Sequence, residues 1–199
     1  MKVYSIRHDV DRFQFFLPAD PECKTFDQLD GSTKLASWEP PEVFILEPKY
    51  RAGNFYNAHG NFLIADERAA EALRPLLEKA GELLPLEYKG RRFTVLNVTA
   101  VVDCLDHDKS EWRIGRNGNR VLVNRYAFRA DLLPPSPIFK LPIGARTTTL
   151  LTEGLMDPAQ ELREIVRREG LKGLRFAELW DSEVPGPGPS WLFNIGQEA

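Results

Sequence analysis

The sequence predicts an α+β fold with a mixed sheet, two main amphipathic helices and an irregular N-terminal arm. A plan of strand, Asp-capped helix, glycine and strand occurs in the middle of the chain and again near its C-terminal end. An Asn-Gly pair between apolar segments adds a hairpin signal. With 199 residues, 43% of them hydrophobic, the chain can bury a sizeable core without disulfides or metals. We expect three parts: an N-terminal strand and arm over residues 1–42, an α+β domain over 43–182 and a Pro/Gly-rich tail over 183–199.

In the N-terminal part, the sequence predicts two short strands and then an irregular arm. Residues 3–6 and 13–17 are apolar segments of strand length. Residues 18–41 are rich in Pro, Asp, Ser and Thr, which are typical of turns. We expect this arm to lie across the body and to insert Phe26 and Trp38.

The first strand–helix–strand unit follows. Residues 62–65 predict a strand, Asp66 is the expected N-cap and Gly81 the expected residue after the helix. Pro75 lies inside the pattern without shifting its phase, so we expect one kinked helix, and then a strand over residues 84–88. The apolar residues at helical spacing are Ala69, Ala72, Leu73, Leu76, Leu77 and Ala80.

The second unit has the same plan. Residues 147–151 are β-branched and extended, and residues 157–160 resemble a capping box with Asp157 as N-cap. Gly170 ends the expected helix, and residues 174–179 alternate like a strand. We interpret the two units as a weak internal repeat of architecture. The apolar face of the second helix is Leu162, Ile165 and Val166.

Between the two units lies the hairpin signal. Residues 111–114 and 120–123 flank Asn117-Gly118, a pair that tolerates the positive φ of tight turns. One interpretation of the arginines on this hairpin is an anion site. We favour the other, in which they prevent an exposed hairpin from pairing with other chains. These arginines are Arg113, Arg116, Arg120 and Arg125.

A long apolar run over residues 93–102 ends in a cluster of acids. The run is suited to a buried strand. Three interpretations of the cluster stay open: a Mg²⁺ or Ca²⁺ site, a charged partner surface or a solvated turn. The spacing does not match the calcium-binding loop, which needs a central glycine. The acids are Asp103, Asp106, Asp108 and Glu111, and Trp112 follows them.

The sequence contains no catalytic or cofactor motif. It has neither GxGxxG, GxxxxGK[ST] nor GxSxG. His8, His59 and His107 are far apart and form no ligand pair. A triad of Asp103, His107 and Ser110 lacks a nucleophile elbow, and local turn bonding by Ser110 is the simpler interpretation. We therefore predict no catalytic residues, no metal ligands and no cofactor.

Charge and cysteine content indicate the compartment and the kind of partner. The net charge of −3 and the pI of about 5.7 give no basic excess for nucleic acid. Charges within the first residues argue against a signal peptide, and no apolar run reaches the roughly 20 residues of a membrane span. Cys23 and Cys104 show no CxxC spacing, which favours a reducing compartment. We expect a cytoplasmic protein with no nucleic-acid or membrane partner.

Two apolar segments leave a homodimer open. Residues 43–46, between Pro41 and Pro48, predict an edge strand. Apolar residues in the tail either dock it onto the body or contact another chain. They are Trp191, Leu192 and Phe193.

Three segments resemble a known family. They are LIADER at residues 63–68, LNVTAVVDCLDHDKSEW at residues 96–112 and GLKGLRFAELWD at residues 170–181. Over residues 43–181 the chain resembles the bacterial polymorphic-toxin immunity family typified by a Myxococcus immunity protein, formerly a domain of unknown function. The resemblance implies a cytoplasmic, non-catalytic protein that binds and neutralises a cognate toxin in bacterial competition. Such a toxin would be encoded nearby and either delivered by contact-dependent or type VI secretion or made by the cell itself.

The resemblance brings no binding residues, cofactor or metal, so the partner surface is inferred from the residues. Our hypothesis is that an acidic patch meets a basic toxin surface and that an aromatic side chain anchors the contact. The alternatives are a divalent-metal-dependent enzyme that uses the acids at residues 103–111, and a structural or oligomeric scaffold. The expected partner-binding residues are Asp103, Asp106, Asp108, Glu111 and Trp112.

Overall fold

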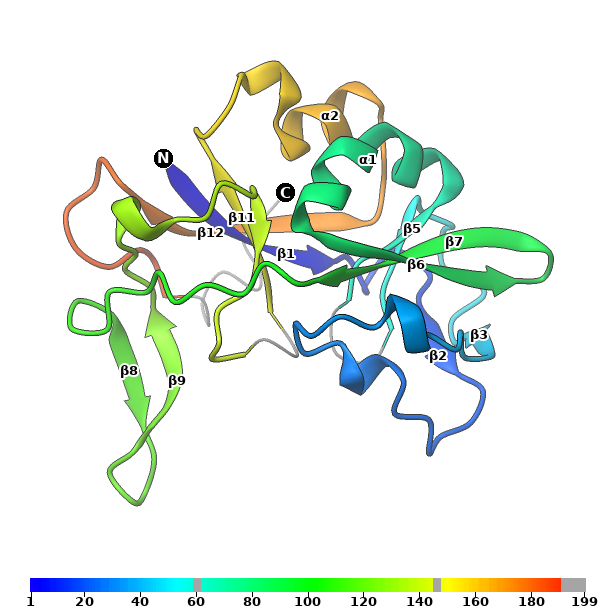
Figure 1. Cartoon of the computed structure of the whole chain (residues 1–199), viewed down its shortest axis with the longest axis horizontal. Helices are drawn as coiled ribbons and strands as arrows, with labels where there is room; N and C mark the ends of the chain where they lie inside the picture. The colour runs from blue at the N-terminus through cyan, green and yellow to red at the C-terminus, as the bar shows by residue number, and fades with distance from the viewer. Residues whose placement is uncertain (59–61, 145–147, 191–199) are drawn as a thin grey trace.

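The computed structural model describes residues 1–58, 62–144 and 148–190. Within them lie two four-stranded sheets, two two-stranded sheets and two α-helices, so the predicted α+β class is confirmed. Both helices lie on the same side of the four-stranded sheets, at the top of Figure 1. The expected single mixed sheet is wrong, because every ladder between the described strands is antiparallel.

The first four-stranded sheet, here the β7 sheet, contains the first predicted unit. Its order is β4-β5-β7-β6. Strands β5 and β6 both run antiparallel to β7, so they are parallel to each other and α1 connects them. The elements are β4 (Phe55–Tyr56), β5 (Ile64–Asp66), α1 (Glu67–Ala80), β6 (Gly81–Tyr88) and β7 (Arg91–Val98).

The second four-stranded sheet, here the β1 sheet, repeats this plan with a strand from the start of the chain. Its order is β10-β11-β1-β12. Strands β11 and β12 are connected by α2 and both run antiparallel to β1, which lies between them. Each unit is therefore a split β-α-β arrangement with an inserted antiparallel strand. The elements are β1 (Lys2–His8), β10 (Ile138–Phe139), β11 (Thr149–Glu153), α2 (Leu162–Arg168) and β12 (Leu174–Asp181).

Helix α1 begins and ends as its sequence predicts. The Asp66 carboxylate accepts a hydrogen bond of 2.9 Å from the Ala69 N–H, which caps the helix, and the helix continues through Pro75. Gly81 follows directly and starts β6. A Cβ on Gly81 would lie 2.0 Å from the Asn97 carbonyl oxygen, so only glycine fits between the helix end and β7.

The start of α2 differs from the prediction. Asp157 caps through the Ala159 N–H at 2.9 Å, but this cap begins a separate 3₁₀ turn (Pro158–Gln160). Glu161 is extended, with φ −73° and ψ 148°, which interrupts the helical path. The α-helix therefore starts only at Leu162. Leu162 and Ile165 are buried as predicted.

A central core lies between the two sheets and the two helices. It joins apolar residues of α1 and α2 to residues of β1, β7 and β11. The opposite face of the β7 sheet is covered by the arm, as predicted: Phe26 is buried there and Trp38 packs against it. The small sheet of β2 (Phe16–Pro18) and β3 (Val43–Ile45) covers the same face, at the lower right of Figure 1.

The apolar run crosses between the two sheets. Its strand ends at Val98, and Val102 then bonds through its N–H to the Lys140 carbonyl at 2.9 Å. Cys104 and Leu105 continue into a third core, which covers the outer face of the β1 sheet with Phe128, Phe139 and Trp180 among others. The run is thus a strand followed by a half-buried crossover. Within the described residues, no helix has the length and apolar character to cross a bilayer.

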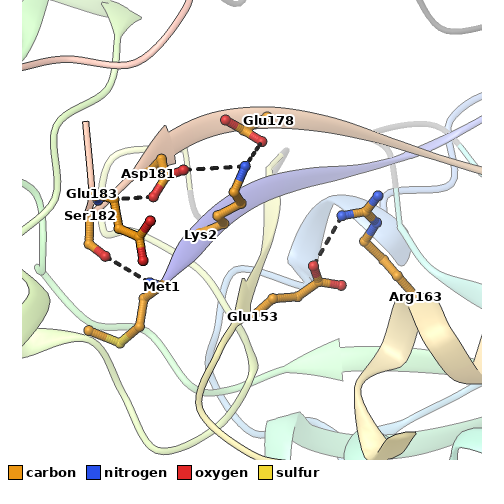
Figure 2. Close-up of polar contacts among 8 residues, drawn as sticks. All are labelled: Met1, Lys2, Glu153, Arg163, Glu178, Asp181, Ser182 and Glu183. Carbon is orange, nitrogen blue, oxygen red and sulfur yellow. Dashed lines mark hydrogen bonds and ion pairs between the residues drawn. The ribbon is translucent and has the colours of Figure 1, made fainter. Parts of the chain in front are cut away.

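Polar contacts fasten β1 in the centre of its sheet (Figure 2). The Met1 amino group donates to Ser182 Oγ at 2.7 Å. Lys2 Nζ lies 2.9 Å from Glu178 Oε2 and 3.3 Å from Asp181 Oδ2, and the hydrogen bond to Glu178 raises the pKa of Lys2. All three partners belong to β12 or directly follow it, so the start of the chain is tied to its C-terminal part.

Helix α2 is fastened to the same sheet by one arginine. The Arg163 guanidinium bonds to Glu153 Oε2 at 3.0 Å and lies 4.3 Å from the centre of the Tyr4 ring. Glu153 is in β11 and Tyr4 in β1, so the contact joins the helix to two neighbouring strands.

A buried lysine connects the arm to the body. The Lys140 side chain is 2% exposed, and its Nζ donates to the Leu29 carbonyl at 2.9 Å and lies 5.6 Å from the centre of the Phe62 ring. Burial lowers the pKa of Lys140 from 10.5 to about 8. Folding therefore shifts Lys140 toward its neutral form, and the amine can donate to Leu29 in either form.

This pKa shift predicts a stability gain in alkali. Between pH 8 and 10.5 the unfolded chain binds more protons at Lys140 than the folded chain, so stability rises with pH there. We expect the free energy of unfolding of the wild type to rise by roughly 3 kcal/mol relative to Lys140→Met across this window. Urea unfolding of both proteins at several pH values measures the difference. Parallel curves would contradict the assignment.

Candidate functional site at the base of the β8–β9 hairpin

The predicted hairpin forms and projects from the body, at the lower left of Figure 1. It consists of β8 (Glu111–Ile114) and β9 (Arg120–Arg125), and Gly118 in its turn has φ 79°. The buried Val123 fastens its base to the third core. The turn and the residues beside it are exposed. The hairpin therefore has a fixed base and a free tip.

Two further contacts fix the base. The Arg125 guanidinium donates to Glu111 Oε1 at 2.7 Å, to the Gly188 carbonyl at 2.7 Å and to the Pro187 carbonyl at 3.1 Å. The buried Ser110 hydroxyl accepts from the Ala127 N–H at 3.0 Å and donates to the Ala127 carbonyl at 3.2 Å. The turn before β8 is thus bonded to the segment after β9.

Trp112 lies between two side chains at this base. Its ring stacks on His107 with 5.7 Å between ring centres and 12° between planes, and the Arg120 guanidinium lies 5.0 Å from the ring centre. The indole N–H donates to the His107 carbonyl at 3.0 Å, and Arg120 Nη1 donates to the same oxygen at 3.2 Å. The indole is half-buried and has one defined orientation, so it would lose little conformational entropy on binding a partner.

The structure places all the predicted acids near Trp112 but pairs most of them with bases. Asp103 Oδ1 lies 3.0 Å from His107 Nε2, and Asp106 Oδ2 lies 3.0 Å from Lys109 Nζ. The bond from the Lys109 side chain lowers the pKa of Asp106. Glu111 bonds to Arg125, as described above. Among the described residues, Asp108 forms no ion pair. Two of the four acids, Asp106 and Glu111, are therefore compensated by a cationic side chain.

The contacts of these side chains also test the two chemical alternatives, a metal site and a hydrolase triad of Asp103, His107 and Ser110. In the part of the chain that the structure describes, no group of three His, Cys, Asp or Glu side chains could hold a metal ion. The imidazole of His107 bonds to Asp103, whereas the Ser110 hydroxyl bonds to the Ala127 backbone. The expected local turn bonding by the Ser110 hydroxyl is therefore wrong, because its partner Ala127 lies 17 residues along the chain, after β9.

A cleft elsewhere is also lined by charges. Its volume is about 890 Å³, and it lies at the start of α1 beside the turn between β6 and β7. Arg92 forms an ion pair with Glu67, and Arg68 Nη2 donates to the Glu169 carbonyl at 2.5 Å. Because these groups already bond to one another, we assign no ligand to this cleft.

Sequence reasoning found Trp112 and the acids but not the role of their neighbours. For Arg120 the sequence suggests an anion site or a charge that prevents edge pairing, and for His107 a triad member or an isolated histidine, but it does not predict that both contact Trp112. The hairpin register places Ile114 opposite Arg120 and Trp112 opposite Val123, so Arg120 shares a face with Trp112. The diagonal position of Arg120 relative to Trp112 was the signal from which their contact could have been predicted. Predictions for His59, for residue 147 and for the tail residues Trp191, Leu192 and Phe193 lie outside the described residues.

No family model matches the sequence, and no curated protein matches it.

Proposed function

We propose that this protein is a non-catalytic immunity protein that binds and neutralises a cognate bacterial toxin. Two lines support the proposal. Three segments of the sequence, at residues 63–68, 96–112 and 170–181, resemble a polymorphic-toxin immunity family. The observation that carries it is the oriented Trp112 indole, fixed between His107 and Arg120 at the base of a projecting hairpin.

This arrangement suits a protein-binding surface. Tryptophan and arginine are the residues in which binding energy is most often concentrated at protein interfaces. A side chain that is already ordered gives up less entropy when the complex forms. The predicted acids surround this anchor and add a polar rim, in which Asp103, Asp108 and Glu111 are exposed.

The cysteines are consistent with action in the cytoplasm. Both Cys23 and Cys104 are free thiols. Cys104 is fully buried, and burial raises its pKa to about 12, so its thiol stays protonated and unreactive. Stability therefore does not depend on a disulfide, and the proposed place of action is a reducing one.

The test is binding and rescue with a defined toxin. The toxin domain encoded beside this gene is expressed in bacteria with and without the protein, and an inactive toxin variant is used to measure affinity. We expect restored growth and a Kd in the nanomolar range, as is usual for specific stable complexes. Growth arrest in the presence of the well-expressed protein, together with no measurable binding, would remove the proposal.

A further inference from the structure

Charge compensation differs between the base and the tip of the hairpin. At the base, three of the four carboxylates face a basic group. Toward the tip, Arg113 and Arg116 are exposed and form no ion pair with any described residue. Within the described part of the chain, the Arg120 side chain donates to the His107 carbonyl and faces the Trp112 ring, with no carboxylate partner. No acidic residue occurs between Trp112 and the end of β9.

Apolar side chains accompany these arginines. Ile114 is 55% exposed and Val121 is 52% exposed, among the highest values for large apolar residues in the described chain. We define the hairpin tip as Arg113, Ile114, Arg116, Arg120 and Val121. Arginine beside exposed apolar surface is a composition typical of the centre of protein interfaces.

Strand pairing leaves one side of the hairpin accessible. Among the described residues, β8 pairs only with β9, whereas β9 also forms a bridge from Arg125 to Ser190. The outer edge of β8 therefore presents backbone groups beside the arginines. A partner segment can approach there without displacing any part of the described chain.

We infer that the hairpin tip binds an acidic surface of the toxin, through arginine–carboxylate contacts around a small apolar centre. The inference rests on the proposed function and deepens it, because it specifies the charge of the partner surface. Guanidinium groups bind carboxylates in a two-pronged geometry that adds specificity as well as energy. The expected partner charge is thus opposite to the one suggested by the acids in the sequence, since two of those acids are paired with Lys109 and Arg125 and the tip arginines have no carboxylate partner among the described residues.

A protein partner fits these observations better than a nucleic acid. The exposed Ile114 and Val121 have no role in contacts to phosphates. The protein carries a net charge of −3, and Asp103 and Asp108 are exposed at the base of the same hairpin. This net charge gives no basic excess of the kind that binding to a polyphosphate chain requires.

The test is charge reversal with a matched control. Arg113→Glu/Arg116→Glu is compared with Lys24→Glu/Lys172→Glu, which changes the net charge equally at exposed positions outside the hairpin. Association rates with the inactive toxin are measured from 50 to 500 mM salt, a range chosen to span strong and weak screening (roughly 14 to 4 Å). Circular dichroism and melting temperatures establish that both variants fold.

We expect the hairpin variant to associate at least tenfold more slowly at low salt and to lose the salt dependence of the wild type. The control is expected to stay within about threefold of the wild type. Equal rates for the two variants, with wild-type binding and rescue intact, would overturn the inference and leave the proposed function standing. Loss of wild-type binding would remove both. Binding of a DNA or RNA duplex that the hairpin variant abolishes would also overturn the inference, in favour of a nucleic-acid partner.

Discussion

Replacing Phe16 by alanine is expected to lower the free energy of unfolding by roughly 3–5 kcal/mol. Phe16 is fully buried, and its ring contacts three others, with centre distances of 4.8 Å to Tyr56, 5.4 Å to Tyr88 and 5.1 Å to Phe93. Truncation removes all three contacts and leaves a cavity between β2 and the β7 sheet. For a chain of this size the melting temperature should fall by roughly 10 °C.

A matched control lies on the neighbouring strand. Phe44 is in β3 of the same two-stranded sheet, but its side chain is 41% exposed. Phe44→Ala should cost less than about 1 kcal/mol, because little buried surface is lost. Urea unfolding and limited proteolysis of residues 18–41 measure both effects. A similar small loss for both variants would mean that the arm is not packed on the sheet as described.

Replacing Trp112 by alanine is expected to weaken toxin binding by roughly 2–4 kcal/mol, which corresponds to about a 30- to 1000-fold rise in Kd. The loss combines the contact area of the indole with the orientation that His107 and Arg120 give it. Trp112→Phe should retain part of the affinity, since it keeps an aromatic ring but loses the bond to the His107 carbonyl. Calorimetric titration with the inactive toxin gives the Kd of each variant.

Trp38 provides the control for this experiment. It is also a half-buried tryptophan, and its indole N–H donates to a backbone carbonyl, that of Pro85, at 2.8 Å. It packs on the arm side of the β7 sheet, whereas Trp112 packs on the third core. Trp38→Ala should therefore lose comparable stability and keep wild-type affinity. A rise in Kd for Trp38→Ala that matches the rise for Trp112→Ala would place the contact elsewhere or make it indirect.

Local signals account for the parts of the fold that the sequence predicted correctly. Asp66 and the apolar stripe after it define α1, and Asn117-Gly118 defines the hairpin, because caps, periodicity and tight turns depend on neighbouring residues. Asp157 is instructive because the same cap chemistry there produced only a 3₁₀ turn. No sequence pattern predicted that Glu161, which follows this turn, would be extended and delay the start of α2.

Long-range pairing explains what was not predicted. The position of β1 between β11 and β12 depends on residues at opposite ends of the chain, such as Lys2 with Glu178 and Asp181. Likewise, the sequence showed a cluster of acids but not that His107, Lys109 and Arg125 would face them. The order of residues shows that charged side chains are near one another along the chain. Which acid then meets which base depends on backbone turns and strand register.

Amide hydrogen exchange can locate the toxin on the β8–β9 hairpin and the turn before it, where we propose that it binds. Exchange of the free protein is compared with that of its complex with the inactive toxin. We expect new protection to be concentrated in residues 103–125 and exchange in the arm at residues 18–41 to stay unchanged. Protection concentrated in the arm, or a stable complex without protection in residues 103–125, would contradict it.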